Sequence, residues 1–89
     1  MACWSEEDLI IQINSLYPIA KATPLKDFYG DDDSVGIWFR GSEEHLDGRL
    51  IYDTYDHNDF CHPKINALLE KANWTWEAYD AGTMMAYPN

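Results

Sequence analysis

The chain has 89 residues, 46% of them hydrophobic and 15% aromatic, and a formal net charge of −10. A chain of this length forms a single domain, 1–89, that buries roughly 60 to 65% of the surface its unfolded chain exposes. The hydrophobic content excludes an intrinsically disordered protein. The charge argues against direct binding to nucleic acid or to an anionic membrane, because both repel an acidic surface. No segment is apolar over the length of a signal peptide or a membrane span, so we expect a soluble, cytoplasmic protein.

The first predicted element is a helix over residues 6–17. Ser5 is a good N-cap, and residues 6–8 are acidic, which the helix dipole favours in a first turn. Pro18 disfavours helical backbone at the preceding residue and therefore predicts that the helix ends at Tyr17. Apolar residues recur at near-helical spacing and form the expected buried stripe of Leu9, Ile10, Ile13, Leu16, Tyr17 and Ala20.

Residues 19–30 are predicted to be irregular, with one short turn of helix. Thr23 and Pro24 are typical of a helix cap and a first helical position, and Gly30 is typical of a helix terminator.

The next four residues, Asp31-Asp32-Asp33-Ser34, resemble the start of a calcium-binding loop. Val35 occupies a position where such a loop needs a ligand, and Ser42 stands in place of the bidentate Glu. We therefore interpret the four residues as a solvated turn.

Two strands, at 35–40 and 49–56, are predicted to form a central β-hairpin. Val35, Ile37 and Phe39 alternate with Trp38 and Arg40, as in a half-buried strand. The connection 41–48 ends in Asp47-Gly48, a strong turn signal.

The second half of the chain predicts another helix and another hairpin. Residues 63–72 begin with Pro63, place Ile65, Leu68, Leu69 and Ala72 on one face, and are followed by Asn73 as a left-handed terminator. Alternation over 74–79 and 83–87 predicts two strands. The element order α-β-β-α-β-β gives an α+β fold in which both helices pack on one face of a four-stranded, mainly antiparallel sheet.

A cluster of possible metal ligands lies between residues 53 and 62. Its spacing matches no closed zinc site, so we interpret His62 as a helix cap and Asp56 and Asp59 as turn residues. Cys61 is a weak candidate nucleophile, because its closeness in sequence to His57 and His62 does not supply the spatial arrangement that catalysis needs. We expect no enzyme, metal or cofactor, and we expect both cysteines, Cys3 and Cys61, to be free thiols.

The sheet face that the helices leave open is expected to carry aromatic side chains, drawn from Trp38, Tyr55, Trp76, Tyr79 and Tyr87. Several of them could instead belong to the core. If exposed, aromatic anchors with a charged rim are typical of a protein-binding surface. A platform for single-stranded nucleic acid would need basic neighbours, and the neighbouring charge here is acidic.

Acidic residues concentrate in one third of the chain: 27–59 contains ten carboxylates and two cations, hence −8 of the total charge of −10. Alternate residues of a strand are about 6.6 Å apart, a spacing comparable to that of successive phosphates, so such carboxylates can imitate a nucleic-acid backbone. The competing interpretation is that they only keep the protein soluble. The predicted partner-binding residues are Asp31, Asp32, Asp33, Trp38, Glu43, Glu44, Asp47, Asp53, Tyr55 and Asp56.

In size, acidity and lack of a catalytic signature the chain resembles the small phage-encoded inhibitors of bacterial defence, which include anti-CRISPR proteins and DNA mimics. This is a resemblance of type, since that class has no common motif. It implies an inhibitor in the host cytoplasm that occludes the basic surface of a nuclease or a guide-RNA effector complex, as a monomer or a homodimer.

Two other classes stay open. The five residues Phe28-Tyr29-Gly30-Asp31-Asp32 are similar to a stretch of the barstar family of ribonuclease inhibitors, but a predicted strand follows here where barstar has a helix. The similarity is too short to indicate homology, and it leaves a toxin-immunity role as an alternative. The other alternative is an assembly module that self-associates through its aromatic sheet face.

Overall fold

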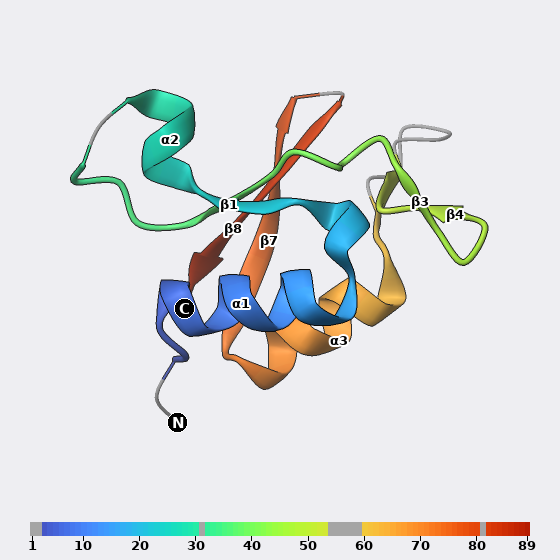
Figure 1. The fold of residues 1–89 in the computed structure, drawn as a ribbon, viewed down its shortest axis with the longest axis horizontal. Helices are drawn as coiled ribbons and strands as arrows, with labels where there is room; N and C mark the ends of the chain where they lie inside the picture. The colour runs from blue at the N-terminus through green and yellow to red at the C-terminus, as the bar shows by residue number, and fades with distance from the viewer. Residues whose placement is uncertain (1–2, 31, 54–59, 81) are drawn as a thin grey trace.

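The computed structural model describes residues 3–30, 32–53, 60–80 and 82–89. They form an α+β fold whose four-stranded antiparallel sheet has the order β1-β2-β8-β7 (Figure 1). No helix within these ranges is long and apolar enough to cross a membrane. The elements are α1 (Glu6–Leu16), the 3₁₀ turn η1 (Pro18–Ala20), β1 (Ala22–Pro24), α2 (Leu25–Tyr29), β2 (Ile37–Phe39), β3 (His45–Leu46), β4 (Arg49–Leu50), β5 (Tyr52–Asp53), β6 (Phe60–Cys61), α3 (Pro63–Lys71), β7 (Trp74–Asp80) and β8 (Thr83–Pro88).

Helix α1 begins where its sequence signals predict and ends one residue before the predicted end. The Ser5 hydroxyl accepts a hydrogen bond from the amide of Asp8 at 3.1 Å, and Tyr17 is the C-cap. Leu9 and Ile13 are fully buried, but Leu16 is 51% exposed, so its assignment to the buried stripe is wrong. The helix ends at Leu16, and Ala20 reaches the core from η1 instead of from the helical face.

Strand β1 is an edge strand that the sequence did not predict. Thr23 and Pro24 are its last two residues, and helix α2 begins one residue later, at Leu25. On the edge away from β2, the Asn14 side chain of α1 forms two hydrogen bonds of 2.9 Å with the backbone of Ala22, one to its N–H and one to its carbonyl. This side chain supplies the partners that a further strand would otherwise provide.

The predicted hairpin of 35–40 with 49–56 is wrong for the residues that the structure describes. Strand β2 pairs with β1 and β8, with Trp38 opposite Thr23 on one side and Met85 on the other. The alternation of β2 was identified correctly, but alternation shows that a segment is a strand and not which strand is its partner.

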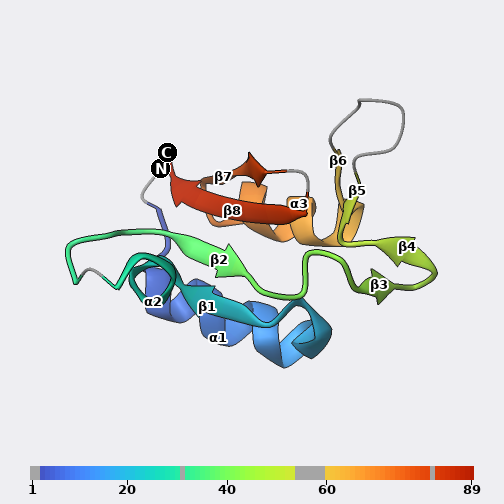
Figure 2. The ribbon, with the colours of Figure 1, turned by 90° about the horizontal axis from the view of Figure 1, so that it is seen from above.

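Residues 45–53 and 60–61 instead form two small ladders, β3–β4 and β5–β6, beside the main sheet (Figure 2). The turn predicted at Asp47-Gly48 is confirmed, with φ of 54° and 83°, and joins β3 to β4. Two left-handed residues in a two-residue loop are what a type I′ hairpin turn requires. The turn signal was thus correct, although the hairpin that it closes is a shorter one.

The second helix and the last hairpin are confirmed. Helix α3 places Ile65, Leu68 and Leu69 in the core, and Asn73 follows it with a φ of 62°. Strands β7 and β8 pair from Trp74 opposite Pro88 to Asp80 opposite Thr83.

A single buried cluster joins α1, α3 and the sheet. Figure 1 shows α1 and α3 side by side below the strands and α2 above β1. Helix α1 contacts β1, and α3 contacts β7. The buried cluster includes Leu9 of α1, Leu69 of α3, Ile37 of β2 and Met84 of β8, each 0% exposed.

The substitution Asn14→Ala tests how β1 is held. It leaves the N–H and the carbonyl of Ala22 without these partners, and we expect the free energy of unfolding to fall by about 1 to 3 kcal/mol. The measurement is urea denaturation. The control Asn66→Ala removes an exposed contact to Glu70 on α3 and is expected to change stability by less than about 0.5 kcal/mol. Equal effects of the two substitutions would contradict the role assigned to Asn14.

Candidate partner-binding surface

The predicted acidic residues lie along the whole length of the molecule. Asp32 and Asp33 are exposed in the loop after α2, and Asp47 lies in the β3–β4 turn at the other end of the long axis (Figure 1). Because β2 does not pair with β4 or β5, these carboxylates do not form one array on two adjacent strands. Three of the predicted site residues, Asp31, Tyr55 and Asp56, lie outside the described residues, and Asp53 is half-buried in β5.

Asp47 is already paired within the chain. Its carboxylate accepts a hydrogen bond from the ammonium of Lys64, and both side chains are solvent-exposed. This hydrogen bond lowers the pKa of Asp47 and raises that of Lys64, with the attraction between the two charges acting in the same directions. Such an exposed pair contributes little to stability, but it neutralises the charge that Asp47 would present to a partner.

Glu43 and Glu44 lie between β2 and β3 and are exposed. Among the described residues, neither side chain has a hydrogen bond or an ion pair. The Glu43 carboxylate lies against the turn between β7 and β8, since a Cβ added at Gly82 would come within 2.6 Å of Glu43 Oε1. Gly82 also donates its N–H to the carboxylate of Asp80 at 2.9 Å. Two carboxylates that are distant in sequence therefore border the same glycine.

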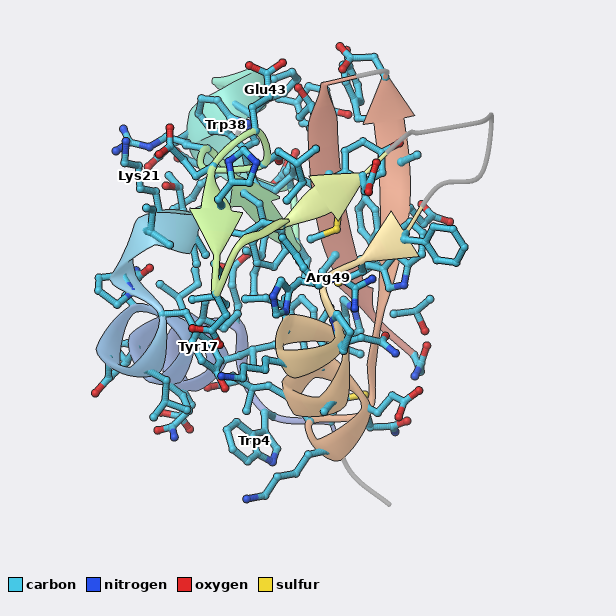
Figure 3. All side chains as sticks on the ribbon, turned by 90° about the vertical axis from the view of Figure 1, so that its right-hand side faces the viewer. Trp4, Tyr17, Lys21, Trp38, Glu43 and Arg49 are labelled. Atoms are coloured by element: carbon cyan, nitrogen blue, oxygen red, sulfur yellow. The ribbon has the colours of Figure 1, made fainter. Side chains whose placement is uncertain are left out.

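Four aromatic rings meet near this turn, with Phe28 of α2 at their centre. The Phe28 ring lies edge-to-face with Trp38 and with Tyr79, each at 5.0 Å between centroids, and with Tyr29 at 5.1 Å. Tyr29 and Tyr79 are about half exposed, at 50% and 49%. Figure 3 shows Trp38 at the same end of the molecule as Glu43, with Trp4 at the opposite end.

Alternation along the strands explains which aromatic side chains share this face. Trp38 lies between Ile37 and Phe39, which belong to the core cluster, so its side chain points away from that cluster. Trp76 packs against the core and lies 6.2 Å from the ring of Tyr52. The predicted exposed face therefore contains Trp38 and Tyr79 but not Trp76.

Tyr87 of β8 extends the same face. Its hydroxyl donates to Met85 Sδ at 3.5 Å. Burial raises the pKa of Tyr87, and the neighbouring Tyr29 hydroxyl and Glu77 carboxylate raise it further. We define the aromatic surface as Phe28, Tyr29, Trp38, Tyr79 and Tyr87. Phe28 and Tyr29 were not predicted as members of this surface. The sequence indicates a short helix with two aromatic residues, but it does not indicate which face of the sheet that helix covers.

In the cluster of possible metal ligands between residues 53 and 62, His62 has a structural role. His62 is the N-cap of α3: Nδ1 accepts a hydrogen bond from the amide of Lys64 at 3.2 Å, and Nε2 lies 2.8 Å from the carbonyl of Leu46. The accepting Nδ1 assigns the proton to Nε2, which donates to that carbonyl. No group of three His, Cys, Asp or Glu side chains in the described ranges is placed to hold a metal ion. Asp56, His57 and Asp59 lie outside those ranges.

Comparisons with known proteins found no matching family model, no matching curated protein and no matching solved structure.

The substitution His62→Ala tests the cap. It removes the acceptor for the Lys64 amide and the donor to Leu46, so we expect a loss of about 1 to 2 kcal/mol in the free energy of unfolding. The exposed His45 of β3 provides the control, and His45→Ala is expected to stay within about 0.5 kcal/mol of the parent protein. Thermal or urea unfolding measures both, and an unchanged stability of the His62 variant would contradict the assignment.

The two thiols are expected to differ in reactivity. Burial raises the pKa of Cys61 to about 12, so that thiol stays protonated and inaccessible at neutral pH. Cys3 is only partly buried, and its Sγ donates to the carbonyl of Asn73 at 3.1 Å. A maleimide reagent should label Cys3 in the folded protein and label Cys61 only after denaturation, as read by mass spectrometry. Rapid labelling of a folded Cys3→Ser variant would contradict the buried position of Cys61.

Proposed function

We propose that this protein is a small acidic inhibitor that binds a basic, nucleic-acid-binding surface of a partner protein and occludes it. The observation that carries the proposal is the aromatic surface bordered by exposed carboxylates, on a chain with a net charge of −10. Aromatic anchors bury large apolar areas at an interface, and a complementary charged rim speeds association and selects the partner.

We propose that α1 and α3 cover one face of the sheet and that the partner covers the other. Trp38 and Tyr79 support this arrangement, because they lie away from the core cluster and beside Phe28 of α2. Glu43, Glu44, Asp32 and Asp33 are exposed and would supply charge around that face.

The partner class is a protein with a cationic groove for DNA or RNA. A nuclease or a guide-RNA effector complex has such a groove, which would make the chain an anti-defence inhibitor of the phage type, resembling anti-CRISPR proteins and DNA mimics. A nuclease toxin has one too, and inhibition of a toxin would make the chain an immunity protein. The same surface chemistry serves both roles, and the identity of the captured partner separates them.

Charge reversal tests the proposal. A tagged protein is used to capture partners from bacterial lysate at low and high salt, and nucleic-acid binding by the captured protein is then assayed. We expect capture to weaken steeply with salt, since exposed charges are screened. We also expect the variant Asp32, Asp33, Glu43 and Glu44→Lys to inhibit at about ten-fold higher concentration or more. This corresponds to a loss of about 1.4 kcal/mol in binding free energy.

The matched control is the triple variant Glu7, Asp8 and Glu70→Lys, which places lysines on α1 and α3 and leaves the aromatic surface unchanged. It is compared with the triple variant Asp32, Glu43 and Glu44→Lys, which changes the net charge by the same amount. Equal loss in both triple variants would show a general charge effect. Retained inhibition in the variant at Asp32, Glu43 and Glu44 would contradict the proposal.

Self-association is the second candidate, because Tyr29 and Tyr79 leave about half of their surface exposed on one face. Light scattering over a range of concentrations distinguishes it from inhibition. A concentration-independent dimer that captures no other protein would support an assembly module.

A further inference from the structure

We propose that the aromatic surface holds the guanidinium group of an arginine from the partner. This inference rests on the proposed function for the source of the arginine. Its physical basis is the geometry and the charge around Phe28, Tyr29 and Tyr79. A free peptide can test this basis in the absence of the partner protein.

The rings are held in fixed orientations before any partner binds. Phe28 contacts Tyr29, Trp38 and Tyr79 with interplanar angles of 90°, 71° and 73°. These rings come from α2, β2 and β7, so their mutual positions depend on the sheet and not on one flexible loop. A site that is ordered in advance loses less conformational entropy on binding.

The charge beside these rings favours a cation. Glu77 lies on β7 opposite Met85, and the register places it on the same face as Trp38, which pairs with Met85 from the other side. The Glu43 and Asp80 carboxylates border Gly82 at the adjacent turn. On α2 the charges of Lys26 and Asp27 offset each other. Arg40, which follows β2 at the end that pairs with the start of β8, and Lys21, which Figure 3 shows near Trp38, oppose part of the remaining charge, and the three carboxylates stay in excess.

Arginine fits this combination better than lysine or an apolar side chain. An aromatic face attracts a cation through its quadrupole, and a planar, weakly hydrated guanidinium can stack on a ring while it donates hydrogen bonds to a carboxylate. A lysine ammonium is more strongly hydrated and cannot stack. A purely apolar occupant would leave the carboxylates unpaired, and a second copy of this chain would add another ten negative charges.

The test uses two capped peptides of equal charge, one containing several arginines separated by glycines and the other containing lysines at the same positions. Binding is followed by NMR through the indole N–H of Trp38 and the backbone amides of β7. We expect the arginine peptide to bind several-fold more tightly than the lysine peptide, and Tyr79→Ala to weaken arginine binding by about three- to ten-fold. The Glu77→Gln variant should weaken the binding of both peptides.

Phe60 of β6 is 57% exposed and makes no ring contact with the aromatic surface among the described residues, so Phe60→Ala is the matched control. Its binding should equal that of the parent protein. Equal affinity for the two peptides, an unchanged affinity of Tyr79→Ala, or shifts confined to α1 and α3 would overturn the proposal. A dimer that Tyr79→Ala dissociates would also overturn it, because a second copy would then be the occupant.

Failure of this inference is distinguishable from failure of the proposed function. Selective binding of the arginine peptide without capture of any basic protein would support the arginine site and contradict the inhibitor role. Salt-sensitive capture that the charge reversals abolish and Tyr79→Ala does not change would support the inhibitor role and contradict the arginine site.

Discussion

The antiparallel pairing of β2 with β8 is the constraint on which the rest of the structure depends. It joins a strand from the first half of the chain to the last strand, with Ile37 opposite Ala86 and Phe39 opposite Met84. These four residues are buried members of the single cluster that α1 and α3 share with the sheet. The same register turns Trp38 to the other face, where its ring contacts Phe28, which in turn contacts Tyr79. One pairing thus positions both the core and the candidate site.

Ser42 determines where this pairing stops. Its hydroxyl is buried, donates to the carbonyl of Phe39 and accepts from the amide of Met84 at 3.0 Å. A buried polar group must be satisfied, and here a single hydroxyl closes the end of β2 against β8. The chain leaves the sheet directly afterwards, so that the next residue, Glu43, lies against Gly82. A structural contact therefore sets the position of a residue that we assign to the partner-binding surface.

Local signals in the sequence predicted the helices and the last hairpin well. Ser5, Gly30 and Asn73 mark helix ends through backbone and capping preferences that depend on only a few neighbouring residues. Asp47-Gly48 predicted its turn for the same reason. Strand β1 was missed because Thr23-Pro24 also matches a helix start, and the contacts that stabilise the strand, its pairing with β2 and the Asn14 side chain, come from other elements.

The candidate site was less predictable, because it depends on which strands pair. Trp38 and Tyr79 were among the five aromatic residues from which the open face was expected to draw, together with Trp76, which packs on the core. Their contact through Phe28 requires β2, β8 and β7 to be neighbours, which alternation does not indicate. The acidic residues were treated as one array on a hairpin that the described residues do not form. Asp47 has an intramolecular partner in Lys64, which no rule of sequence spacing indicates.

The central claim is that the partner binds the face formed by α2, β2 and the β7–β8 turn. Hydrogen exchange of the protein, free and bound to a captured partner, tests this most directly. The account predicts new protection at residues 26–30, 38–44 and 77–80, with α1 and α3 unchanged. Protection confined to α1 and α3 would contradict it.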